Sequence, residues 1–169
     1  MINRPQPNEY PPYASGYVGL VGNDPILDIL EHQKEITYNF LIRMGEAKGD
    51  FSYEPGKWTV KQVVGHMIDA ERTFAYRALC FSREAIELPG FDQDLYIEKA
   101  NFNARSLEDL ANELKTTRSS NLYLFKSFSE EQLLQKGIAS NNPVSVRGIL
   151  YIAAGHEMHH IKILRERYL

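Results

Sequence analysis

TVKQVVGHMIDAER (residues 59–72) and AAGHEMHHIKILRERYL (residues 153–169) are the two stretches that decide the fold. Both have the apolar spacing of amphipathic helices, and they carry three inward-facing histidines: His66 in the first, and His156 with His160 in the second. Residues four apart lie on one face of a helix, so His156 and His160 can hold one ion between them. A third imidazole from another helix would complete a three-ligand site with a free coordination position, which is typical of catalytic zinc.

Four long helical segments are predicted, and no strand pattern of comparable strength competes with them. They run from about Pro25 to Ala47, from Thr59 to about Ser82, from Ser106 to about Phe128, and from Ser145 nearly to the C-terminus. Their expected caps are Asp24 before Pro25, Thr59 with Gln62, Ser106 with Asp109, and Ser145. A further capping box, Ser129 with Gln132, begins a short helical piece that ends at Gly137. This pattern predicts an all-α helix bundle.

Residues 1–22 are rich in proline and tyrosine and are expected to form an irregular arm, followed by a single domain over residues 23–169. The connection from Glu84 to Arg105 is long for a bundle, and long ordered connections are often binding loops or lids.

Composition indicates an ordinary globular chain of 169 residues, with 43% hydrophobic and 24% charged residues. No membrane span or signal peptide is apparent, and the single cysteine, Cys80, agrees with a reducing compartment, so a cytoplasmic location is expected. The net charge of -3 gives no global basic field, which disfavours nucleic acid as a partner.

One side of the second helix carries mostly small or polar side chains, whereas the neighbouring side carries bulky apolar ones. This difference predicts a cavity beside His66. The small, polar stripe consists of Val63, His66, Ala70, Thr73 and Arg77. Thr73 and Arg77 are candidate pocket residues, and Arg77 either pairs with an acid inside the bundle or binds an anionic substrate. We expect the loop from Pro89 to Tyr96 to cover the pocket partly.

The tyrosines of the arm, Tyr10, Tyr13 and Tyr17, are expected to pack near this pocket or across a dimer partner.

The residues around the three histidines were considered for other roles. HEMHH also fits H-E-x-x-H, the metalloprotease motif, but only nine residues follow His160 to supply a downstream ligand. Glu157 remains a candidate catalytic base beside a metal-bound water, with an exposed helix carboxylate as the alternative. His159 should point away from the inward-facing side of the last helix, and His32 should lie on a solvent-exposed face of the first helix.

Several segments together resemble the DinB/YfiT-like superfamily of metal-binding four-helix bundles. They are YEPGKWTVKQVVGHMIDAERTFAYRAL (residues 53–79), LPGFDQDLY (88–96), NFNARSLEDL (101–110) and VSVRGILYIAAGHEMHHIKILRERYL (144–169). The resemblance implies an up-down bundle in which one histidine of the second helix and two of the fourth bind zinc, nickel or another divalent ion. It also implies a homodimer.

Two enzymatic hypotheses and one non-enzymatic hypothesis follow. Characterised members of the family add low-molecular-weight thiols to electrophiles or isomerise with a thiol cofactor, and others are regarded as hydrolases. The leading hypothesis is therefore thiol S-transfer to a small molecule, ahead of metal-dependent hydrolysis. The third hypothesis is a binding protein in which the metal only ties helices together.

Overall fold

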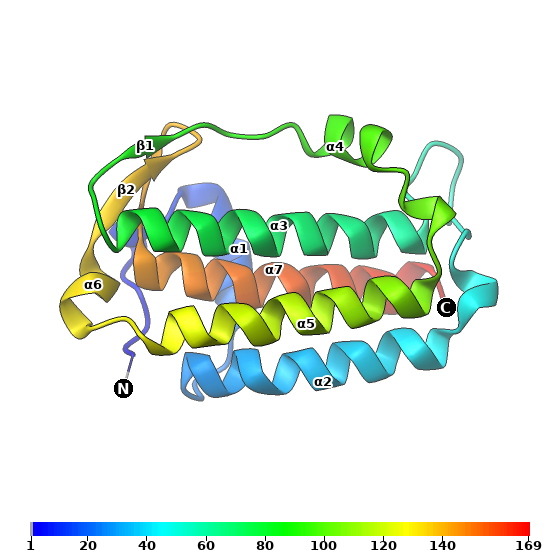
Figure 1. Ribbon diagram of the computed structural model, residues 1–169, viewed down its shortest axis with the longest axis horizontal. Helices are drawn as coiled ribbons and strands as arrows, with labels where there is room; N and C mark the ends of the chain where they lie inside the picture. Colours follow the sequence, from blue (N-terminus) through cyan, green and yellow to red (C-terminus); the bar gives the residue numbers. More distant parts are fainter. Residues whose placement is uncertain (1) are drawn as a thin grey trace.

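The computed structural model describes residues 2–169 and shows four long helices packed along their lengths (Figure 1). They are α2 (Ile26–Met44), α3 (Val60–Phe81), α5 (Leu107–Lys126) and α7 (Val146–Arg167). The predicted all-α four-helix bundle is confirmed. None of the helices in this part of the chain has the length and hydrophobicity that a membrane span requires.

The polar caps predicted from the sequence are present in all but one case. The Thr59 hydroxyl accepts a hydrogen bond from the Gln62 amide, and the Gln62 side chain accepts one from the Thr59 amide. Side-chain caps are also present at Ser106, Ser129 and Ser145. The prediction that Asp24 caps the first helix is wrong, because Pro25 keeps an extended ψ of 129° and is itself the residue before Ile26.

Helices that follow each other in the chain are not always neighbours in space. α2 and α3 each pack against both α5 and α7, so they lie diagonally across the bundle. α3 and α5 run in the same direction, so the alternating up-down order that the resemblance implied does not hold for this pair, and the connection between them returns along the outside of α3 (Figure 1). The long connection is as predicted, but it also contains β1 (Glu87–Leu88), α4 (Gln93–Ala100) and a 3-10 turn at Phe102–Ala104.

A small sheet joins the long connection to the segment before α7, and the sequence did not predict it. After α6 (Glu130–Leu134), β2 (Lys136–Ala139) pairs antiparallel with β3 (Asn142–Ser145), and β1 adds parallel to β2. The turn between β2 and β3 places Ser140 and Asn141 at positive φ, 51° and 63°, as a two-residue hairpin turn requires. Strands of two to four residues are too short to produce a detectable alternation.

The expectation of an irregular N-terminal arm is wrong for its second half. Two 3-10 turns (Pro7–Glu9 and Pro12–Ala14) lead into α1 (Ser15–Leu20), which packs on α7. A Cβ atom built on Gly155 of α7 would lie 2.0 Å from the carbonyl oxygen of Tyr17, so glycine permits this close approach. The segment SGYVGL contains two poor helix formers, and its helix is stabilised by the burial of Ala14 and Val18.

The apolar core forms two separate clusters, one toward each end of the bundle. The first centres on residues such as Phe81, Phe125 and Leu150, and the second on Ile68 and Leu110. Between them lies a layer of buried polar side chains from α3, α5 and α7: His66, Glu71, Arg118, His156 and Glu157.

Candidate metal centre

Three histidine side chains converge where α3 and α7 pack antiparallel. Nε2 of His156 lies 3.0 Å from Nε2 of His66 and 3.1 Å from Nε2 of His160. These three form the group of candidate ligand atoms that lie within 4.8 Å of one another in the described residues, and no carboxylate or thiol joins them. The structure therefore brings together the three histidines that the sequence singled out.

This donor set fits a divalent metal ion better than it fits hydrogen bonds among the rings. A ring nitrogen carries either one N–H group or one in-plane lone pair, so Nε2 of His156 cannot bond well to both of its neighbours. Three ligands at about 2.0–2.1 Å from a tetrahedral ion would lie about 3.3 Å apart, close to the observed spacings. A shared cation satisfies all three nitrogens at once.

The protonation of the rings agrees with this fit. Burial lowers the pKa of His66 to about 4, against the opposing charge of Asp94. Burial also lowers the pKa of His160 to about 3, with help from His66 and His159. Burial and the neighbouring His160 and His66 hold the pKa of His156 well below its ordinary value. All three imidazoles are neutral at pH 7, so each keeps a lone pair for a metal ion.

Aromatic rings surround the three histidines. The Trp58 ring centre lies 5.0 Å from that of His66, and the rings of Phe74 and Tyr17 each lie 5.5 Å from that of His156 in edge-on arrangements. Such contacts restrict the orientations of the imidazoles and keep water away from their sides.

A cavity of about 210 Å³ opens beside the centre, where the small stripe of α3 predicted it. Its wall includes His66, His156 and Ala70. The loop before α4 contributes Phe91, the first residue of α4 is Gln93, which also lines the cavity, and the arm contributes Pro11, Tyr13 and Tyr17. The predicted covering by the loop and the arm is confirmed for these residues. Tyr10 instead packs against the core.

The model of the DinB superfamily matches residues 29–164, which is most of the chain. The chain belongs to the DinB superfamily. All three histidines of the candidate centre lie inside the matched range, whereas the arm lies before it.

Two solved structures of Bacillus subtilis proteins resemble this DinB-superfamily fold. YfiT is described as a probable metal-dependent hydrolase with an unusual four-helix bundle topology; it is 18% identical, with a TM-score of 0.76 over 94% of this chain and 91% of that chain. The DinB-like protein YjoA is also 18% identical, with a TM-score of 0.59 over 83% of this chain and 86% of that chain. Among curated protein sequences, none matches the chain significantly. At this identity the two structures support the fold alone.

Of the two predicted pocket residues, Arg77 lines the cavity and Thr73 does not. At 100° per residue from His66, Ala70 and Arg77 fall at about +40° and +20°, whereas Thr73 falls at about -20°. The cavity lies on the side of the stripe where these angles are positive, and Phe74 on that side also contributes to its wall. Thr73 donates its hydroxyl to the Asp69 carbonyl of its own helix at 2.9 Å.

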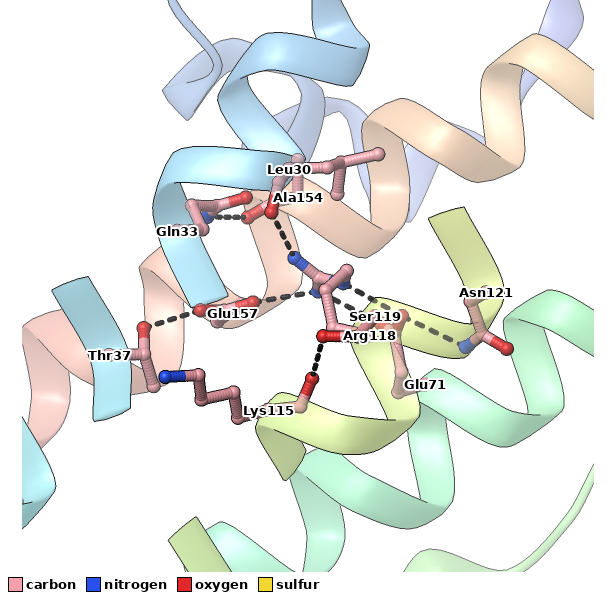
Figure 2. Close-up of polar contacts among 10 residues, drawn as sticks. All are labelled: Leu30, Gln33, Thr37, Glu71, Lys115, Arg118, Ser119, Asn121, Ala154 and Glu157. Atoms are coloured by element: carbon pink, nitrogen blue, oxygen red, sulfur yellow. Dashed lines mark hydrogen bonds and ion pairs between the residues drawn. The ribbon is translucent and has the colours of Figure 1, made fainter. Parts of the chain in front are cut away.

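Glu157 follows His156 in the chain but points in another direction, about 100° around α7. One carboxylate oxygen accepts the hydroxyl of Thr37 on α2, and the other accepts Nη2 of Arg118 at 2.7 Å (Figure 2). The residue is 4% exposed, so it is not the exposed carboxylate that was the alternative interpretation. With both oxygens engaged on the side of α2 and α5, Glu157 takes no part in the chemistry proposed below.

Arg118 is the centre of a buried ion cluster that sequence analysis missed. Its Nε and Nη2 atoms donate to the two oxygens of Glu71 at 2.7 and 2.9 Å, and Asn121 donates to Glu71 at 3.0 Å (Figure 2). Burial raises the pKa of the Glu71 carboxyl, but Arg118 and Asn121 outweigh it and leave that pKa below its ordinary value. The cluster joins α2, α3, α5 and α7 next to the histidines. Only the spacing of the charges on apolar helix faces could have suggested it.

The remaining two histidines lie outside the centre. His32 is exposed, as predicted. His159 is partly buried and stacks edge-on against Tyr17, with ring centres 5.3 Å apart.

Proposed function

We propose that this protein is a metal-dependent enzyme that acts on a small molecule, with thiol S-transfer as its leading activity. The observation that supports the proposal is the convergence of three neutral imidazoles at the wall of a cavity. His66 and His156 face that cavity, so a ligand inside it can approach the centre directly.

The three histidines would hold a divalent ion, with zinc or nickel as the candidates. When bound, the ion supplies a lowered pKa to a thiol or a water molecule at its open side. The chain itself orients the rings, through Trp58 and Phe74, and surrounds the reacting atoms with aromatic walls. A thiol would lose its proton to solvent, and its sulfur would then form a bond to the electrophilic carbon as the leaving group departs.

Thiol transfer is preferred over hydrolysis because no carboxylate accompanies the three histidines in the described residues. A thiolate attacks without a further base, whereas hydrolases of this type commonly use a neighbouring glutamate. Hydrolysis is the second candidate because YfiT is described as a probable metal-dependent hydrolase. On the family resemblance alone, the protein is also proposed to be a homodimer.

Elemental analysis of purified protein tests the centre. We expect about one equivalent of a divalent metal, and a sharp loss in His66→Ala, His156→Ala and His160→Ala. His32→Ala is the matched control because it removes an exposed imidazole. Full metal content in His66→Ala would overturn the assignment of the centre.

A pair of activity assays separates the two chemistries. Consumption of a small thiol with monochlorobimane, dependent on metal and abolished in His160→Ala, would support transfer. Release of an acid or alcohol from model esters and amides without added thiol would support hydrolysis. Neither activity in metal-loaded protein, together with a metal-dependent rise in melting temperature, would support the non-catalytic alternative.

A further inference from the structure

Arg77 is a buried cation without an acidic partner. The residue is 8% exposed, and residues 2–169 supply it with no ion pair. Arg118, the other arginine of similar burial, pairs with two carboxylates. Burial lowers the pKa of Arg77, with an opposing effect from Tyr13, yet a guanidinium stays protonated at neutral pH. The protein therefore keeps a positive charge without a countercharge in the wall of the cavity.

The hydrogen bonds of Arg77 leave most of its donors free. Nη2 donates to the carbonyl oxygen of Pro89 at 3.0 Å and to Oγ of Ser140 at 3.2 Å, which accounts for the two N–H groups on that atom. Nη1 and Nε carry three further N–H groups without a partner in the described chain. The fully buried side-chain atoms without a hydrogen-bond partner do not include Nη1 or Nε of Arg77. Both atoms are therefore accessible to solvent. Arg77 and Ser140 both line the cavity, so a ligand inside it can reach the guanidinium.

The position of Arg77 suits a ligand that also reaches the histidines. Arg77 lies eleven residues after His66 on α3, about 16 Å along the helix axis. Both residues line the same cavity, so a ligand bound at Arg77 can extend through it toward His66. The wall between the two ends is largely apolar and aromatic, with Ala70, Phe74 and Ile152.

We propose that Arg77 binds the carboxylate of a small organic acid with an apolar body, whose other end reaches the three-histidine centre. One guanidinium balances one negative charge, which matches a carboxylate, whereas a phosphate dianion would bring in a second charge. The Ser140 hydroxyl accepts from Arg77 and can donate its own hydrogen to the same carboxylate. This inference rests on the proposed function in one respect only, namely that the acid is the substrate or thiol cofactor of the centre.

A matched pair of probes tests the inference: 3-phenylpropanoate and its neutral amide. By calorimetry, the carboxylate should bind the purified protein about tenfold to hundredfold more tightly than the amide, the range expected for charge-assisted hydrogen bonds. Arg77→Gln should abolish the difference, and Arg77→Lys should retain part of it. Arg83→Gln is the control because it removes an exposed arginine just beyond the end of α3.

Two further measurements separate the ways in which the inference can fail. In the wild type, the side-chain Nε–H resonance of Arg77 should shift when the carboxylate is added and not when the amide is added, which needs no variant to fold. Metal content is measured in every variant. Equal affinity for the two probes in protein with full metal would overturn the role of Arg77 alone, whereas absence of metal with the carboxylate preference intact would overturn the centre alone. Unchanged preference in Arg77→Gln would also refute the inference, because the carboxylate would then bind elsewhere, including at the metal.

Discussion

Arg118→Met should destabilise the protein strongly. Arg118 is 2% exposed and donates three charged hydrogen bonds, two to Glu71 and one to Glu157, at 2.7–2.9 Å. Its removal would leave two carboxylates of 3% and 4% exposure with only Asn121 and Thr37 as donors. Breaking a buried pair in this way costs about 3–5 kcal/mol. For a chain of this size, that loss lowers the melting temperature by about 6–20 °C.

The assay is unfolding by urea at pH 7, with metal content measured in parallel. Arg105→Met is the matched control, because Arg105 lies just before the same helix and also pairs with two carboxylates, Asp109 and Glu113, but its side chain is 33% exposed. Exposed pairs contribute at most about 1 kcal/mol. An equal loss in the two variants would refute the argument that burial of the cluster determines its contribution.

The pH dependence gives a second test of the same cluster. Because the pKa of Glu71 is lowered in the folded protein, its pairing stabilises the fold above the ordinary glutamate pKa of 4.5 and is lost as the pH falls through the folded value. The stability difference between wild type and Arg118→Met should therefore be largest near neutrality and should narrow below pH 4.5. Replacing Arg118, Glu71 and Glu157 together by Met, Leu and Leu should recover most of the loss, since an apolar set of similar volume removes the unpaired charges. Failure to recover would mean that packing, not charge, determines the cost.

Two further changes test the packing of the N-terminal arm. Gly155→Ala should push the backbone of Tyr17 away from α7 and cost about 1–3 kcal/mol on unfolding, with metal content retained, whereas no loss of stability would contradict the close approach. Glu9→Gln removes the carboxylate that accepts two hydrogen bonds from Arg147 at 2.6 and 2.8 Å. Burial raises the pKa of Glu9, but Arg147 and the amide of Gln6 hold it below its ordinary value, so the stability difference should be present at pH 7 and disappear below about pH 4.5, whereas a pH-independent difference would contradict this role.

The sequence predicted what depends on local geometry. The capping box of Thr59 and Gln62 requires only neighbours three residues apart, and the shared face of His156 and His160 requires only the helical repeat. The cavity beside His66 was also predictable, because Ala70 leaves volume on the same stripe. These features do not depend on which helix packs against which.

The features that were missed depend on tertiary contacts. α1 forms because Val18 is buried against α7, although its own sequence favours helix poorly. The parallel packing of α3 against α5 depends on the long connection that returns along the bundle between them, and composition does not encode that path. Glu157 looked like a base because its sequence neighbours are ligands, and only the position of Arg118 shows where its carboxylate is directed.

Three consecutive residues of α7 contact three different parts of the protein. The prediction of a single inward-facing side for this helix was therefore incomplete. Gly155 contacts α1, His156 faces α3 and the cavity, and Glu157 pairs with Arg118 on α5; successive residues are about 100° apart, so the three point in three directions. α7 is therefore surrounded over this turn, and α1 supplies its remaining side. Tyr17 of α1 lines the cavity, yet it lies before the range that matches the superfamily. The candidate metal ligands thus belong to the shared bundle, while part of the cavity wall comes from a segment outside it, so family membership alone does not specify the shape of the cavity.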